Sequence, residues 1–313
     1  MILTDKPPLH NQLEFFIEEA IKARPVRTAV VHPVEHNGLR GAIEAAQRGL
    51  IEPILVGPEA KIRAAAEIEE LDISDYELIS VEHSHAAAEK AVDLVREAKA
   101  ETLMKGDLGT SELLSAVIHK TRGIRTERRQ SHVFVLDVPN YHKPLMITDA
   151  AINVTPDLLV KRDIVQNAIN FCHALNIEQP KVAILAAVEK VKPSMQSTID
   201  AAALCKMADR GQITGGIIDG PLAFDNAISL QAAMDKHISS PVSGDADILL
   251  APDLESANMI AKQLIYLADA KSAGIALGAK APIILNSRSD GTLARLASCA
   301  LASHMVLHPE KVK

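Results

Sequence analysis

Apolar runs of strand length alternate along this chain with segments whose apolar residues recur at helical spacing. The runs in the first half cover 26–32, 53–56, 76–81, 102–105, 132–138 and 145–148. Those in the second half cover 182–187, 216–219, 248–251, 274–277 and 283–285. Alternation of this kind favours βαβ units, so we expect an α/β fold built on mainly parallel sheets.

The segments between the runs have the spacing of amphipathic helices. Within 255–269, four apolar residues share one helical face: Met259, Ile260, Leu264 and Leu267. Thr155 before Pro156 predicts an N-cap with proline at the first helical position, which opens a long helix toward Leu175. After a turn at Asn286 and Ser287, the spacing predicts a last helix over about 291–304.

A chain of 313 residues exceeds the usual length of one domain. The best breaks in the pattern are the proline-flanked segment 139–144 and the region 279–282. We therefore expect a first α/β/α domain over 1–143, completed by 284–313, and a second over 144–283. A ligand cleft is expected between the two domains, on a scaffold like that of the isocitrate and isopropylmalate dehydrogenases.

The composition limits the partners and the compartment. A formal net charge of -7 and an aromatic content of 3% argue against a nucleic-acid partner, so any anionic ligand needs a local positive patch. The first residues lack the layout of a signal peptide, and no apolar run is long enough to span a bilayer. The 3 cysteines, widely separated, are typical of reduced thiols. We expect a cytoplasmic protein without membrane contact.

The most informative segment is the apolar strand that ends in Ser287-Arg288-Ser289-Asp290. The carboxyl ends of strands in open α/β sheets are where ligands bind, so a hydroxyl, a guanidinium and a carboxylate placed there are candidates for chemistry. The alternative is structural, because Ser and Asp also cap helices and an arginine often forms only a surface ion pair.

A second candidate is the segment 103–112, which has the pattern of a strand, a glycine-bearing loop and a helix start. Gly106 and Gly109 permit close backbone approach, and Thr110 with the first helical N–H groups could hold a phosphate whose charge Lys105 offsets. An ordinary βα turn with a capping threonine explains the same pattern.

Two weaker groups of residues complete the candidates, and the common metal and nucleophile motifs are absent. The segment 120–129 concentrates basic residues that suit a nucleotide phosphate, although a solvated basic loop is the alternative. Gly220, Pro221 and Gly244 suit loops that approach a ligand. No paired cysteine motif, HExxH or nucleophile elbow is present, so we expect no metal and no serine nucleophile.

Six segments together resemble the phosphate acetyl/butyryltransferase family, in order and in residues, over about Val26 to the C-terminus. They are 105–107, 219–225, 240–250, 252–255, 270–274 and 287–290. The same module occurs behind an enoyl-CoA hydratase domain in some bacteria, and this chain would correspond to the transferase portion. The resemblance implies two α/β/α domains, a homodimer, and reversible transfer of a short acyl group, acetyl or butyryl, between coenzyme A and inorganic phosphate.

The physical requirements of such a reaction suggest roles for the candidate residues, although the family's own base and anion clamp cannot simply be transferred to this chain. Arg288 would bind phosphate, Ser287 would donate to the carbonyl oxygen or hold the thiol, and Asp290 would be the base for a thiol whose ordinary pKa is about 8.5. Arg122 and Arg125 would bind coenzyme A, which is a substrate, and no cofactor is bound permanently. The expected substrate-binding residues are Lys105, Gly106, Asp107, Thr110, Gly220, Pro221 and Gly244.

Two departures from the family pattern keep other functions open. Ala294 stands where known acetyltransferases place an aspartate, and Ser115 stands where they place an arginine. A sensor that binds acyl-CoA without turnover is therefore one alternative. A metal- and NAD-dependent hydroxyacid dehydrogenase on a related scaffold is the other, although the carboxylate cluster and arginine clamp that it needs are not evident.

Overall fold

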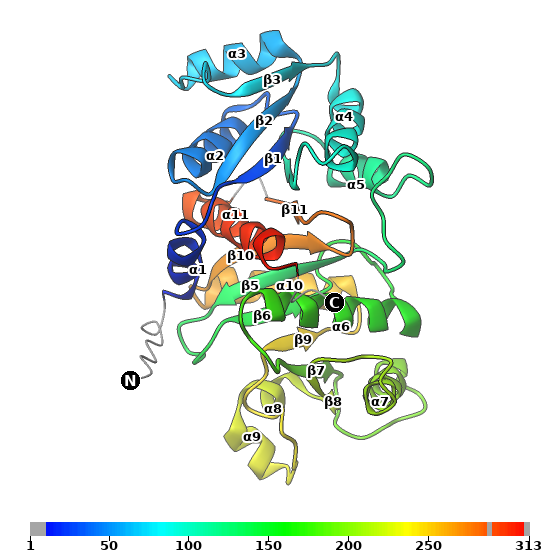
Figure 1. The fold of residues 1–313 in the computed structure, drawn as a ribbon. Coiled ribbons are helices and arrows are strands. Elements are labelled where there is room, and N and C mark those ends of the chain that lie inside the picture. The colour runs from blue at the N-terminus through cyan, green and yellow to red at the C-terminus, as the bar shows by residue number, and fades with distance from the viewer. Residues whose placement is uncertain (1–10, 287–289, 310–313) are drawn as a thin grey trace. The chain divides into compact units, whose positions relative to one another are not determined.

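The computed structural model describes residues 11–286 and 290–309. Contacts divide the chain into two compact units (Figure 1). The N-terminal unit contains Leu13–Arg128 and Ala273–His308, and the central unit is built mainly from Arg129–Ser272. The domain boundaries expected at 143/144 and 283/284 stay predictions.

Every expected strand forms. In the N-terminal unit these are β1 (Val26–Val31), β2 (Ile51–Gly57), β3 (Glu77–Ser80), β4 (Thr102–Lys105), β10 (Lys271–Leu277) and β11 (Ile283–Ile284). In the central unit they are β5 (Ser131–Asp137), β6 (Leu145–Thr148), β7 (Lys181–Leu185), β8 (Ile217–Leu222) and β9 (Ile248–Leu250). The apolar runs predict these strands well because most of their residues are buried on both faces.

The N-terminal unit has the strand order β3-β2-β1-β4-β11-β10, and only the β10–β11 pair is antiparallel. Two groups of helices cover it, and Figure 1 shows them on opposite sides of the strands. One group is α2 (His36–Gln47), α3 (Glu59–Ile68) and α11 (Thr292–Leu307). The other is α4 (Ser84–Arg96) and α5 (Thr110–Val117), while α1 (Gln12–Ala20) lies near the start of the chain.

The central unit has the order β5-β6-β9-β7-β8, with only β5–β6 antiparallel. Its helices are α6 (Leu158–Ala174), α7 (Gln196–Asp209), α8 (Phe224–Ile228), α9 (Leu230–Asp235) and α10 (Leu254–Leu267). Side chains alternate across the sheet. Leu145 and Ile147 join the core beneath α10, whereas Met146 between them contacts Cys172 of α6. The expected α/β fold with mainly parallel sheets is confirmed.

Three local expectations differ from the structure. Helix α6 begins at Leu158 because the carboxylate of Asp157 accepts the N–H of Val160, so Thr155 is not the N-cap. Gly109, not Thr110, is the N-cap of α5. Gly220 and Pro221 lie inside β8 rather than in a loop. Within the described residues every helix is too short or too polar to cross a lipid bilayer.

Candidate active site

The carboxyl ends of β1, β4 and β11 lie side by side in the N-terminal unit. Val31 pairs with Lys105, and Ile284 pairs with Met104, so the chain leaves the three parallel strands at the same edge. From β1 the chain builds β2 and β3 on one side and then returns to β4 on the other. The strand order therefore reverses between β1 and β4, and such a switch point is the usual ligand site of an open α/β sheet.

Gly106 lets the backbones of β1 and β4 meet closely beyond the last strand residues. The N–H of Gly106 donates to the carbonyl of Val31 (2.9 Å), and the N–H of Asp107 donates to the carbonyl of His32 (2.9 Å). A Cβ atom at position 106 would lie 2.5 Å from the Val31 carbonyl oxygen and 2.8 Å from that of His32. Only glycine fits there, so the expected close approach is structural in origin.

Asp107 joins the β4–α5 turn to the start of α2. Its Oδ2 atom accepts the backbone N–H of Glu35 at 2.6 Å, immediately before α2. Burial raises the pKa of this carboxyl above its ordinary value, although the N–H of Glu35 partly opposes that rise. Asp107 therefore holds the turn in place and is partly shielded from solvent.

Lys105 and His32 donate hydrogen bonds to the backbone carbonyl groups of the same turn. The Lys105 ammonium lies 3.1 Å from the Gly106 oxygen and 3.4 Å from the Leu108 oxygen. The Nδ1 atom of His32 donates to the Asp107 oxygen at 3.0 Å. Positive and N–H groups thus gather at the end of β4, where the sequence predicts a phosphate site.

The segment after β11 is attached to α11 through Asn286. This residue is 8% exposed, and its Nδ2 atom donates to Ser298 Oγ (3.2 Å) and to Asp290 Oδ2 (3.4 Å). Its Oδ1 atom has no hydrogen-bond partner among the described residues. Asp290 is partly buried at this edge, whereas the predicted Ser287 and Arg288 lie outside the described residues.

Arg122 and Arg125 belong to the same unit but have other contacts. The Arg122 guanidinium lies 3.7 Å from Glu89 Oε2 and 3.9 Å from Asp93 Oδ2. Arg125 forms an isolated β-bridge with Ala279. A role in binding coenzyme A stays a prediction for both.

The predicted glycine and proline sites of the central unit are explained by packing. A Cβ atom at Gly220 would lie 2.7 Å from Ile184 Cβ. Gly244 has a φ of +74°, and a Cβ atom there would lie 2.5 Å from the nitrogen of Leu230. Both positions require glycine for the fold, so their conformation supplies no argument for a ligand.

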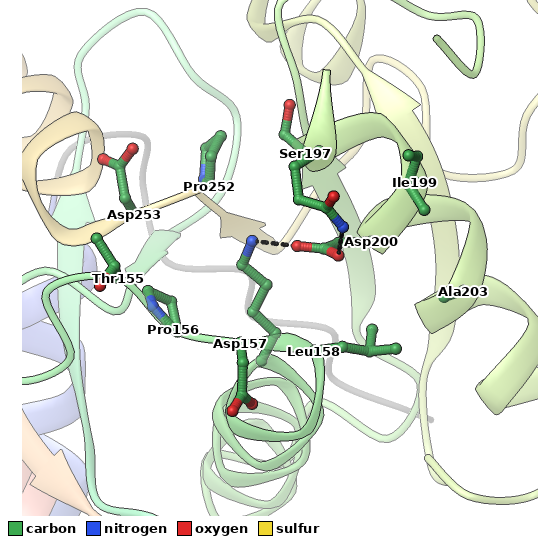
Figure 2. Close-up of a pocket in the computed structure, with 12 residues that line it drawn as sticks. Thr155, Pro156, Asp157, Leu158, Ser197, Ile199, Asp200, Ala203, Pro252 and Asp253 are labelled. Atoms are coloured by element: carbon green, nitrogen blue, oxygen red, sulfur yellow. Dashed lines mark hydrogen bonds and ion pairs between the residues drawn. The ribbon is translucent and has the colours of Figure 1, made fainter. Parts of the chain in front are cut away.

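The central unit contains a pocket that the sequence did not reveal. It follows β6, β7 and β9 at their carboxyl ends and has a volume of about 620 Å³, a size that suits a small-molecule ligand (Figure 2). The ammonium of Lys161 donates to Asp200 Oδ2 at 2.7 Å, with side chains only 7% and 8% exposed. Asp157 and Asp253 also line the pocket. Three carboxylates against one ammonium disfavour an anion there.

The fold is an open α/β sheet whose order reverses between β1 and β4, and proteins of this class usually bind ligands at such an edge. A family model described as "Phosphate acetyl/butaryl transferase" matches residues 81–302. The chain belongs to the phosphate acetyl/butyryltransferase family.

Similar proteins agree with this assignment. The chain is 55% identical to the phosphate acetyltransferase of Rickettsia felis, over 96% of this chain and 88% of that protein. It is 40% identical to the phosphate butyryltransferase of Clostridium acetobutylicum, over 90% and 94%. The structure of a branched-chain phosphotransacylase from Enterococcus faecalis V583 superposes with a TM-score of 0.78 at 27% identity, covering 90% and 99%.

The expected dehydrogenase-like scaffold is confirmed as a likeness of fold. A 4-hydroxythreonine-4-phosphate dehydrogenase from Klebsiella pneumoniae has a TM-score of 0.58 at 12% identity, over 91% of this chain and 100% of that one. Family membership supports the transferase interpretation over the dehydrogenase alternative.

Two residues of the candidate site, His32 and Asn286, were not predicted as functional. The sequence signal for His32 is that a polar residue ends the apolar run of a strand directly before Pro33. The signal for Asn286 is its position directly before the Ser287-Arg288 motif, although its residue type alone predicts only a turn.

Replacing Gly106 by alanine tests the close approach at the switch point. We expect Gly106→Ala to lower the free energy of unfolding by about 1–3 kcal/mol through overpacking, and to reduce activity by displacing the turn. Gly109→Ala is the matched control, because its Cβ would lie 3.7 Å from Ser111 Oγ and only a capping loss below about 1 kcal/mol is expected. Urea unfolding measures both; equal stability of the two variants would contradict the steric argument.

Breaking the buried ion pair of the pocket should be costly, because the remaining charge is left without a partner. We expect Asp200→Leu or Lys161→Met to destabilise the protein by about 3–5 kcal/mol, and the double variant to recover much of that loss. The measurement is a double-mutant cycle of urea midpoints. Additive losses would show that the two side chains do not depend on each other.

Proposed function

We propose that this chain transfers a short acyl group reversibly between coenzyme A and inorganic phosphate. The observation that carries the proposal is membership of the phosphate acetyl/butyryltransferase family over residues 81–302. The gathering of Lys105, His32 and the α5 start at one sheet edge supports it, since a phosphate needs N–H donors and positive charge.

The acyl group that we propose is acetyl. Relatives named phosphate acetyltransferase are 55% and 56% identical to this chain. Those named phosphate butyryltransferase are 40% and 42% identical. The chain differs at fewer positions from the acetyltransferases, so its acyl pocket should resemble theirs more, which favours the shorter acyl group.

The reaction that we propose is direct attack at the acyl carbonyl. In one direction a phosphate oxygen attacks acyl-CoA, the carbon–sulfur bond breaks, and the thiolate takes up a proton. Arg288 offsets phosphate charge, Ser287 donates to the carbonyl oxygen, and Asp290 exchanges a proton with the sulfur. Lys105 and Thr110 hold the phosphoryl group together with the backbone of Gly106 and Asp107.

The remaining proposals concern coenzyme A and the setting of the reaction. Arg122 and Arg125 contact coenzyme A, which acts as a substrate, and no resident cofactor takes part. Gly220 and Pro221 within β8, and Gly244 before β9, support the acyl-CoA side through the backbone that they shape. A cytoplasmic location suits a supply of acyl-CoA and phosphate, and three free cysteines agree with a reducing compartment.

A panel of acyl-CoA esters tests activity and preference together. We expect phosphate-dependent thiol release to be fastest with acetyl-CoA and slower with propionyl- and butyryl-CoA, because the relatives named phosphate acetyltransferase are more similar to this chain than those named phosphate butyryltransferase. The measurement is the rate of free thiol formation with and without phosphate, and detection of the acyl phosphate.

Two arginine variants control the panel. Arg288→Ala should lower turnover by about 10²–10³-fold, since it removes a donor to developing charge. Arg210→Ala, which removes an exposed arginine after α7, should leave turnover unchanged. Binding of coenzyme A without thiol release by the native protein would favour the sensor alternative and contradict the proposal.

We propose a homodimer whose contact includes α10, because three apolar side chains of this helix are largely exposed. Met259 is 64%, Tyr266 66% and Leu267 81% exposed. Leu267→Glu is expected to shift the mass in solution from that of two chains to that of one, as light scattering would show. Ile68→Glu, at a residue 77% exposed on α3, is the matched control and should leave the mass unchanged. A monomeric native protein would refute the dimer.

A further inference from the structure

His32 has a backbone conformation that its place in the fold does not explain. Among the described residues, six that are not glycine have φ between 52° and 64°. Five of them directly follow the C-cap of a helix, where the left-handed conformation is the usual way to end a helix: Glu70, Ala98, Asn176, His237 and Asp269. His32, at φ 57°, instead follows the last residue of strand β1.

Backbone bonds on both sides keep His32 in this conformation. Its N–H donates to the Val56 carbonyl of β2 at 2.7 Å, and its carbonyl accepts the N–H of Asp107 after β4 at 2.9 Å. The residue is thus fixed between two neighbouring strands at the switch point. Left-handed residues other than glycine persist only where their surroundings hold them, and they cluster at functional sites.

The same surroundings fix the ring. Nδ1 donates to the Asp107 carbonyl at 3.0 Å, so the proton of a neutral imidazole is on Nδ1 and the lone pair is on Nε2. On the other side the ring borders Gly57 at the end of β2, where a Cβ atom would lie 3.8 Å from the Cδ2 atom of His32. The side chain remains half-buried. A half-buried imidazole with a fixed tautomer is the arrangement that acid–base catalysis requires.

The position of His32 beside the predicted phosphate group indicates its role. Register pairs Val31 with Lys105, so His32 adjoins Gly106 across the strand pair. The turn that His32 contacts contains the residues proposed to hold the phosphoryl group. Monohydrogen phosphate attacks through an unprotonated oxygen, and the proton on another of its oxygens must leave because the acyl phosphate that forms is more acidic. The proposed functions of Ser287, Arg288 and Asp290 supply no group for that proton.

We propose that His32 Nε2 accepts the proton of inorganic phosphate as a phosphate oxygen attacks the acyl carbonyl of acyl-CoA, which rests on the proposed acyl transfer. The oxygen–carbon bond forms, the carbon–sulfur bond breaks with its electron pair on sulfur, and the thiolate takes up one proton. The proton gained by His32 balances the one gained by sulfur, and exchange with water restores both groups. In reverse, His32 returns a proton to the departing phosphate.

Variants of His32 separate proton transfer from support of the turn. Asparagine tolerates the left-handed conformation and keeps a donor near the position of Nδ1, but it has no counterpart of Nε2. We expect His32→Asn to lower kcat for acetyl phosphate formation by about 100-fold, with the KM for phosphate changed less than about threefold. His237→Asn is the matched control, since it makes the same change at φ 54° in the central unit.

Two readouts exclude a purely structural role. The native rate should rise with pH because Nε2 accepts a proton only when it holds none, and His32→Asn should lose that rise. Any pH dependence that is due to phosphate itself is common to both proteins. The titratable groups on the segments around His32 are Lys105, Asp107, Glu35 and His36.

Free imidazole provides the second readout. His32→Gly folds without strain at φ 57°, so it also serves if the asparagine variant is unstable. Added imidazole should restore much of its activity. Native activity with unchanged turnover and pH profile in both variants would overturn the role of His32 and leave the transferase function standing. No activity in the native protein would overturn both proposals.

Discussion

The candidate site depends on the close approach of the β1 and β4 backbones beyond their last paired residues. The bonds from Gly106 to Val31 and from Asp107 to His32 extend the strand ladder into the turn, and a side chain at position 106 would prevent them. Because the turn is held there, Lys105 and His32 can donate to its carbonyl groups. Helix α5 begins directly after this turn, so the orientation of its N-terminus also depends on the close approach of β1 and β4.

The two units differ in the charge that they place at the carboxyl ends of their strands. The central pocket combines Asp157, Asp200 and Asp253 with Lys161, and two of those aspartates cap helices. The N-terminal edge gathers an ammonium, an imidazole and a helix start, together with Asp107, which already accepts an N–H, and the partly buried Asp290. In a protein of net charge -7, this local difference favours an anion at the N-terminal edge over the central pocket.

Much of the fold could be predicted because burial on both faces makes the strands continuous apolar runs. Beginnings of helices were harder. Thr155-Pro156 has the pattern of a helix start, yet the N-cap is Asp157, whose carboxylate accepts the N–H of Val160. Gly220 and Pro221 resembled a loop, but they extend β8 because glycine is needed against Ile184. Local chemistry is readable from the sequence, whereas competition between neighbouring partners depends on packing.

The same distinction explains why the motif residues were found and His32 was not. Ser287, Arg288 and Lys105 stand out because their chemistry contrasts with the apolar strands before them. A histidine after a strand has no such contrast until its φ, its Nδ1 partner and the missing side chain of Gly57 are known together. The backbone carbonyl that fixes the tautomer of His32 belongs to Asp107, whose N–H in turn bonds the His32 carbonyl. One steric requirement, glycine at position 106, therefore controls both the place of the turn after β4 and the tautomer of the histidine beside it.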